Sequence, residues 1–244
     1  MWLGVVNLAV PGGCAFCEAD IEPEEGKPLF CETCVGLLGP EPWVACRCCG
    51  RPCDERRMGS PDDGCPQCRT QVYHFDGVTA LGPYRDALRH AVLRMKRRTG
   101  DHLARAVGDL VFRRRADQLA ALKPDVVVPV PMHWWRHMKR GTNSPEIVAA
   151  RISRHLGVSF ERAMLVRHHR TAPQAELSPT KRFENVRGAF RLRGGYAIKE
   201  ARVLLVDDIM TTGATCSEAS KVLKKAGAAA VFAAVVARTV DPTR

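Results

Sequence analysis

The sequence predicts an α/β protein in which a mostly parallel sheet follows a small cysteine-rich segment. Ten of the 11 cysteines precede residue 69. From about residue 75 onward, short β-branched runs alternate with helical patterns, which favours parallel strands connected by helices. We therefore expect two domains, residues 1–73 and 74–244. The first domain is too short and too poor in apolar runs to form a large core, so we expect it to depend on bound metal.

Hydrophobic patterns place the elements of the second domain. Apolar runs predict strands at 78–81, 125–130, 203–206 and 229–237, and longer periodic segments predict helices at 85–98, 103–122, 144–156 and 217–226. Residues 167–195 show no clear period and carry many basic side chains. We therefore expect a long loop with short strands there. Long loops of this kind often act as lids over functional sites.

The stretch from residue 203 to 215 carries the clearest chemical signal. An apolar strand ends at Asp207 and Asp208, and a loop of small and hydroxyl-bearing residues leads into the next helix. The amides of such a loop and of a helix N-terminus bind phosphate. Two carboxylates repel phosphate and suit ribose hydroxyls, Mg²⁺ or a developing positive charge, so we expect a ligand with a ribose beside a phosphate. The expected phosphate-binding residues are Thr211, Thr212, Gly213, Ala214 and Thr215.

Two common nucleotide-binding motifs do not match this stretch. A P-loop requires a lysine that this loop lacks, and a dinucleotide-binding turn requires three glycines, whereas Gly213 stands alone. The remaining alternative is an ordinary strand–turn–helix with a capping Thr or Asp. That alternative accounts for one polar residue, but not for two acids and three threonines within nine positions.

A second cluster of polar residues follows the predicted strand that ends near Pro131. Several arginines come after it in the chain. If this loop faces the phosphate loop, its amides and arginines can hold a pyrophosphate, because arginine binds phosphate bidentately and stays charged. The alternative is a solvated helix face. The expected residues of this half of the site are Pro131, Met132, Arg136, Arg140 and Arg167.

The cysteines form four Cys-x-x-Cys pairs. Thirteen residues separate the first two pairs and fifteen separate the last two, and the second of these spacings fits a zinc site. We expect two structural Zn²⁺ sites, because each pair supplies two thiolates to a tetrahedral ion. A disulfide framework is the alternative, and it requires an oxidising compartment. The expected ligands are Cys14, Cys17, Cys31, Cys34, Cys46, Cys49, Cys65 and Cys68.

Three further cysteines have no assigned partner. Cys48 and Cys53 are surplus to the pairs, and either a small packed thiol or a replacement ligand is consistent with their positions. Cys216 lies at the start of the helix after the phosphate loop, where both a packed and a reactive thiol are conceivable.

No part of the sequence predicts a membrane segment. The apolar residues 1–10 lack a basic leader, and no later stretch approaches eighteen uninterrupted apolar residues. We therefore expect a cytoplasmic protein that does not contact a membrane.

The chain is strongly basic, with a formal net charge of +11. Two tetrathiolate zinc sites would reduce this to about +7. Dense basic runs attract nucleic acid without regard to sequence, and Trp134, Trp135, His168 and His169 could offer stacking surfaces beside them. The alternative is that some arginines bind pyrophosphate and the others cover solvated helix faces. The basic runs are 94–98, 113–115, 136–140 and 167–170.

These motifs resemble known families. Residues 203–215 are similar to the phosphoribosyl-pyrophosphate (PRPP) motif of type I phosphoribosyltransferases, and nearly the whole chain resembles the ComF family of phosphoribosyltransferase-like proteins. The ComF resemblance is carried by the ribbon 46–52, by Val128–Pro131 with Arg140-Gly-x-Asn143, and by the acids and loop at 207–215. It is also carried, between the two halves of the site, by Arg167, Gln174, Leu177, Arg182, Asn185, Val186, Gly188 and Phe190. Thr142 and Ser144 depart from the family pattern.

The resemblance implies a double zinc ribbon followed by a type I phosphoribosyltransferase-like domain that binds PRPP with Mg²⁺. It also implies a role in DNA uptake during natural transformation, together with a helicase. Three functions remain open from the sequence. The first is a phosphoribosyltransferase in which Asp207 and Asp208 stabilise the cationic sugar. The second is a competence factor that binds single-stranded DNA and a helicase. The third is a sensor that binds PRPP without turnover.

Overall fold

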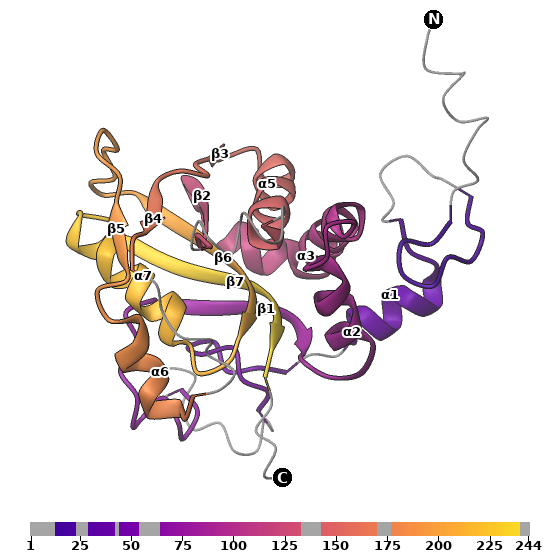
Figure 1. Ribbon diagram of the computed structural model, residues 1–244, viewed down its shortest axis with the longest axis horizontal. Coiled ribbons are helices and arrows are strands. Elements are labelled where there is room, and N and C mark those ends of the chain that lie inside the picture. Colours follow the sequence, from indigo (N-terminus) through magenta and orange to yellow (C-terminus); the bar gives the residue numbers. More distant parts are fainter. Residues whose placement is uncertain are drawn as a thin grey trace, which may run out of the picture.

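A five-stranded parallel sheet forms the centre of the molecule (Figure 1). The computed structural model describes residues 13–22, 29–41, 44–53, 64–132, 143–169 and 177–239. The strand order is β1-β7-β6-β2-β3, and every neighbouring pair is parallel. The strands are β1 (Gly77–Pro83), β2 (Val126–Pro129), β3 (Ser159–Phe160), β6 (Arg202–Met210) and β7 (Ala230–Arg238). The predicted mostly parallel sheet is therefore confirmed.

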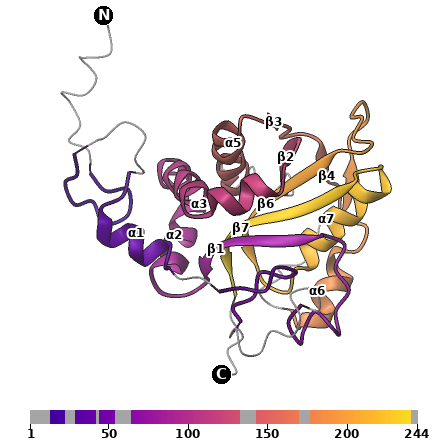
Figure 2. The same ribbon diagram turned by 180° about the vertical axis from the view of Figure 1, so that it is seen from behind.

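Alternate side chains of the strands enter two separate cores, one on each face of the sheet. Leu204 and Val206 of β6 pack with α2 (Asp86–Met95), α3 (Asp101–Ala121) and α5 (Ser144–Leu156). Val203 and Leu205 pack on the other face, with α7 (Ala214–Lys225). Figures 1 and 2 show these helices on opposite sides of the sheet. Because both faces are covered, the strands have apolar runs instead of the alternation of a half-exposed sheet.

The segment expected to be a long loop with short strands also contains a helix that the sequence analysis did not predict. Strands β4 (Leu165–Arg167) and β5 (Phe190–Leu192) form an antiparallel hairpin, and α6 (Pro179–Val186) lies between them in the chain. The short strands were expected, but the helix was missed because only eight residues form it and most are polar. The hairpin packs on the α7 side of the sheet through Leu165 and Phe190.

The two cysteine-rich ribbons lie against different parts of this α/β unit. The first ribbon contains α1 (Glu32–Leu38), which the sequence analysis did not predict, and it lies beside α2 (Figures 1 and 2). Its residues Cys34 and Leu38 belong to the same apolar core as α2 and α3. The second ribbon contacts β1, where the amide of Val78 donates to the carbonyl of Arg47 at 3.0 Å. None of the described helices is long and apolar enough to cross a bilayer.

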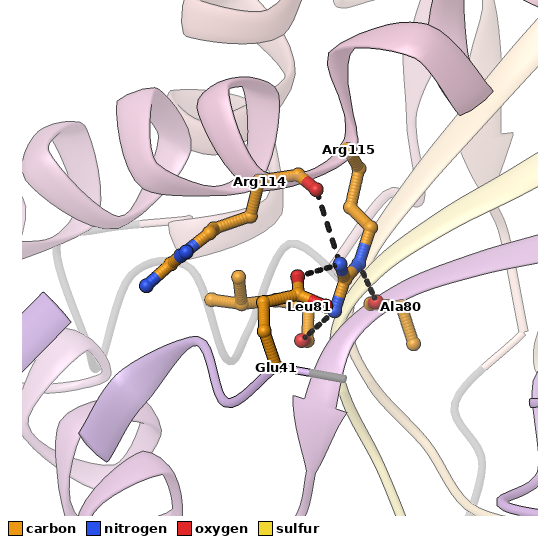
Figure 3. A network of polar contacts seen from close by, with 5 residues as sticks. All are labelled: Glu41, Ala80, Leu81, Arg114 and Arg115. Atoms are coloured by element: carbon orange, nitrogen blue, oxygen red, sulfur yellow. Dashed lines mark hydrogen bonds and ion pairs between the residues drawn. The ribbon is translucent and has the colours of Figure 1, made fainter. Parts of the chain in front are cut away.

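Arg115 connects the segment after the first ribbon to the sheet, and this corrects its expected role. Only 3% of its surface is exposed, and α3 is kinked at this residue. Its guanidinium partners, drawn in Figure 3, are the backbone carbonyls of Ala80, Leu81 and Arg114 and the carboxylate of Glu41. The expectation that the whole run 113–115 offers its charges to nucleic acid is therefore wrong for Arg115, although Arg113 is exposed.

Replacing Arg115 by alanine should destabilise the fold. The substitution leaves buried carbonyls of β1 and the carboxylate of Glu41 without their partner, which costs about 3 kcal/mol, or roughly 6–12 °C in Tm. Thermal unfolding followed by circular dichroism measures the effect. Arg113→Ala is the matched control, because its exposed side chain should leave Tm within about 1–2 °C of wild type. Equal Tm values for the two variants would contradict the structural role of Arg115.

Candidate functional site

A cavity of about 510 Å³ opens where the strands β1, β2 and β6 end. The carboxyl edge of a parallel sheet is the usual place for a ligand in such folds. The chain segments that line the cavity lie far apart in sequence and meet only in the folded protein. The lining residues are Tyr84, Lys96, Val130, Pro131, Met132, Asn143, Pro145, Arg167, Asp207, Asp208, Ile209, Met210, Thr211, Gly213, Ala214, Thr215 and Cys216.

The predicted phosphate loop, residues 211–215, connects β6 to the start of α7 and lines part of this cavity. Gly213 precedes the first residue of α7 with φ = 85°, a left-handed conformation that a side chain would strain. Its carbonyl accepts the amide of Ser217 at 2.8 Å, and this bond begins the helix. Four of the five predicted loop residues line the cavity. Thr212 does not line it, and its hydroxyl instead accepts the amide of Ala214 at 3.4 Å.

The two acids lie side by side at the end of β6 in different environments. Asp207 is 9% exposed, and its Oδ1 accepts the amide of Asp208 at 2.8 Å. Burial raises the pKa of Asp207 to about 7, and the charge of Asp208 acts in the same direction, while that amide and the charges of Lys96 and Arg167 oppose the shift. Asp207 therefore holds its proton more readily than an ordinary aspartate does. The pair can both accept and donate hydrogen bonds to ligand hydroxyls.

Lys96 belongs to the site, and the sequence analysis missed it. Its Nζ lies 3.1 Å from Oδ2 of Asp208, and both side chains are largely buried. The sequence analysis grouped it with the basic run 94–98, but the structure separates that run. Arg94 binds the carbonyl of Phe16 in the first ribbon, whereas Arg97 and Arg98 are exposed. Helical spacing from the buried Leu88 and Val92 could have indicated that Lys96 faces inward.

The cavity lining also includes part of the predicted pyrophosphate site. Pro131, Met132 and Arg167 line the cavity as expected. The guanidinium of Arg167 lies over the ring of Phe190, 5.5 Å from its centre, so β5 supports it. Arg136 and Arg140, together with Trp134, Trp135 and residues 1–10, are outside the described part of the chain.

Two further lining residues, Asn143 and Cys216, contribute polar atoms. Asn143 precedes α5 and is 9% exposed, and its Oδ1 has no hydrogen-bond partner among the described residues. The sequence analysis quoted Asn143 in a motif without giving it a role. Cys216 is buried, and burial raises the pKa of its thiol well above the ordinary value. Of the two alternatives for this thiol, the structure favours the packed one.

The eight predicted metal ligands form two groups of four thiols. Cys14, Cys17, Cys31 and Cys34 form one group, and Cys46, Cys49, Cys65 and Cys68 form the other. Neighbouring sulfur atoms lie 3.6–3.8 Å apart, for example Cys49 and Cys65 at 3.6 Å and Cys46 and Cys68 at 3.8 Å. A tetrahedral zinc ion with bonds of about 2.3 Å requires thiolates about 3.8 Å apart. Both groups therefore fit zinc, and none of the 11 cysteines forms a disulfide.

Comparison with known proteins identifies the family. Residues 142–243 match the model of the phosphoribosyl transferase domain. Competence protein F of Haemophilus influenzae is 31% identical over 167 residues, which cover 67% of this chain and 73% of that protein. The chain belongs to the competence protein F family. The family resemblance stated from the sequence is therefore confirmed.

Further relatives match over almost their whole length. DNA utilization protein YhgH of Salmonella typhi is 27% identical over 237 residues, and that of Escherichia coli K12 is 27% identical over 235 residues. Each alignment covers 95% of this chain and 99% of the relative. A purine phosphoribosyltransferase structure from Pyrococcus horikoshii matches 57% of this chain and 89% of its own, with a TM-score of 0.36 and 19% identity. That similarity is too low to support an inference.

Freshly purified protein should contain about two zinc ions per chain, one for each group of four thiols. Each structural site contributes on the order of 10 kcal/mol of apparent binding energy, so chelation should unfold the ribbons. Cys65→Ser should remove about one ion and leave the other. Elemental analysis measures both numbers. Cys48→Ser is the matched control, because that thiol lies outside both groups and should retain both ions. Less than half an ion in fresh wild-type protein would disprove the assignment.

Proposed function

We propose that this member of the competence protein F family binds PRPP, or a related phosphoribosyl ligand, with Mg²⁺ in the cavity at the end of β6. One observation carries the proposal. The acid pair, the phosphate loop and two cationic side chains, which are separate in sequence, line a single cavity. Its volume of about 510 Å³ is within the range of small-molecule sites.

Each part of the cavity suits a different part of the ligand. The amides and hydroxyls of the loop from Thr211 to Thr215 suit the 5′-phosphate at the N-terminus of α7. Asp207 and Asp208 suit the ribose hydroxyls. Arg167 and Lys96 line the same cavity as the acids, and Lys96 pairs with Asp208. They suit the pyrophosphate, and we assign the same role to Arg136 and Arg140.

A magnesium ion is compatible with this set of groups. Mg²⁺ prefers oxygen ligands and usually binds through one or two carboxylates and the phosphates of the substrate. Asp207 and Asp208 supply such carboxylate oxygens at the cavity wall. The ion would neutralise pyrophosphate charge. In the ligand-free protein, Lys96 neutralises Asp208.

The same arrangement suits phosphoribosyl transfer. In that reaction the bond between the ribose C1 and the pyrophosphate oxygen breaks, a bond to a nitrogen nucleophile forms, and pyrophosphate leaves. Positive charge develops on the sugar, and the adjacent carboxylates would stabilise it. Binding without turnover, as in a sensor, requires the same residues. Release of pyrophosphate from PRPP separates the two functions.

PRPP with Mg²⁺ should raise the Tm of the wild-type protein, because a ligand that binds only the folded state stabilises it. The double substitution Asp207→Asn and Asp208→Asn should abolish the shift, since it removes both charges that hold the ribose and the metal. Differential scanning fluorimetry measures both. Asp117→Asn is the matched control, because this aspartate is exposed on α3 outside the cavity. A full Tm shift in the double variant would place the ligand elsewhere.

We further propose that the protein acts in DNA utilization or uptake in the cytoplasm, with single-stranded DNA and a helicase as partners. The relatives named competence protein F and DNA utilization protein support a role connected with DNA. Arg97 and Arg98 also support it. They follow the cavity-lining Lys96 in the chain and are exposed, so their charges are open to a phosphate backbone. Tetrathiolate metal sites persist in a reducing compartment, in agreement with the cytoplasm.

Reversing Arg97 and Arg98 to glutamate should weaken binding to single-stranded DNA and flatten its salt dependence. Each lost phosphate contact reduces the slope of log K against log salt by about 0.7, so two contacts reduce it by roughly 1.4. Fluorescence anisotropy with a labelled single strand at several salt concentrations measures the slope. Reversal of the exposed Arg187 and Arg191 is the matched control, because Arg187 follows α6 and Arg191 lies on β5, and both elements contact α7. Identical slopes for both variants would show that Arg97 and Arg98 do not contact DNA.

A further inference from the structure

The second ribbon is connected to the cavity loop at residues 211–213 through the side chain of Arg238. Arg238, the last residue of β7, has no exposed surface. Its Nε donates to the carbonyl of Cys49 at 2.8 Å, and its Nη1 donates to the carbonyls of Met210, at 3.0 Å, and Thr211. Cys49 belongs to the second group of four thiols, whereas Met210 and Thr211 line the cavity. One side chain therefore connects a metal-ligand segment to the ligand loop.

An aromatic contact makes a second connection between the same two parts. Tyr73 packs against the cysteines of the second ribbon. Its ring also lies against Gly213, so closely that a Cβ at that position would be 3.0 Å from the ring. The amide of the next residue, His74, donates to Oγ of Ser217 in the first turn of α7 at 3.1 Å. The segment after the second ribbon therefore contacts both the loop and the helix that begins there.

The charge of Arg238 gives a reason why the metal matters for this support. The described residues form no salt bridge with its guanidinium, whose partners are backbone carbonyls, and a buried charge without a counter-ion is costly. Four thiolates around Zn²⁺ carry a net charge of about −2. The second group, to which Cys49 belongs, therefore compensates Arg238 when it holds the metal.

We propose that the metal-bound second cysteine group holds the loop at residues 211–213 in its ligand-binding conformation, with Arg238 and Tyr73 as the positioning residues. Zinc occupancy of this group and ligand affinity of the cavity are then coupled, and such coupling is reciprocal. The statement about ligand affinity rests on the proposed function, whereas the statement about the loop does not. The first group packs with α2 and α3 on the other face of the sheet, so the coupling belongs to the second group.

Hydrogen exchange of the loop tests the support without any ligand. Cys65→Ser, which removes the second metal site, should accelerate amide exchange in residues 211–217 by about tenfold, because the loop loses its anchor. Cys17→Ser is the matched control for metal loss, since it removes the first site and should leave exchange in this segment unchanged. Equal exchange of this segment in wild type and Cys65→Ser would overturn the proposal.

Substitution of the positioning residues tests the effect on the ligand. Arg238→Lys keeps the charge but cannot reach three carbonyls at once, so it should retain both zinc ions and bind PRPP with Mg²⁺ about tenfold more weakly. Arg202→Lys is the matched control, because Arg202 also donates to backbone carbonyls, those of Leu122 and Lys123, but at the opposite edge of the sheet. Isothermal titration calorimetry gives the affinities, and elemental analysis gives the metal content.

Variants of Tyr73 test the coupling independently, in case the Arg238 variant misfolds. Tyr73→Phe keeps the ring against Gly213 and should bind like wild type, whereas Tyr73→Ala should weaken binding and accelerate exchange in the loop. Wild-type affinity in both Arg238→Lys and Tyr73→Ala would overturn the coupling. If wild-type protein itself does not bind PRPP, the proposed function fails, and the exchange experiment still decides whether the second group supports the loop.

Discussion

The parallel pairing of β6 with β2 and β7 is the constraint on which the rest of the structure depends. Val206 pairs with Pro129 on one side and Asp207 pairs with Val235 on the other, so β6 lies buried between two strands that run in the same direction. Parallel strands end at a common edge, and this edge brings the acid pair, the loop after β2 and the start of α7 together. The cavity, the pKa of Asp207 and the support from the second ribbon all follow from this arrangement.

Buried arginines attach the two ribbons to the sheet. Arg115 bonds to Glu41, in the segment after the first ribbon, and to the carbonyl of Leu81 in β1. Arg238, in β7, donates to the carbonyl of Cys49 in the second ribbon. The apolar contacts of such small segments are few, although Cys34 and Leu38 of the first ribbon enter the core. A planar guanidinium with several donors can bridge carbonyls from different segments at once. Burying its charge is costly, so these contacts specify one docked arrangement more than they add stability.

The electrostatics of the cavity suit a ligand of mixed charge. Asp207 is buried beside Asp208, and its raised pKa reflects the cost of two charges in that position. Lys96 and Arg167 reduce that cost in the ligand-free protein. A ligand that brings both hydroxyls and phosphates offers partners to each side. The acids gain hydroxyl donors, and the cations gain phosphate oxygens in place of a carboxylate. Under the proposed function, the site would exchange internal contacts for ligand contacts of the same type.

The sequence by itself determined the elements that depend on local pattern. Apolar runs identified the buried strands, and the Cys-x-x-Cys spacing identified both thiol groups. The acids and most of the small-residue loop singled out in the sequence line one cavity. The boundary between residues 73 and 74 and the ligand roles stay predictions. Only the tertiary structure decided which basic residues are surface groups. Lys96 reaches Asp208, Arg115 and Arg238 are buried, and Arg97 stays exposed. The reason is physical: a charged side chain in a basic run carries no local signal of burial, because its partners are backbone carbonyls and acids that come close only when the sheet has formed.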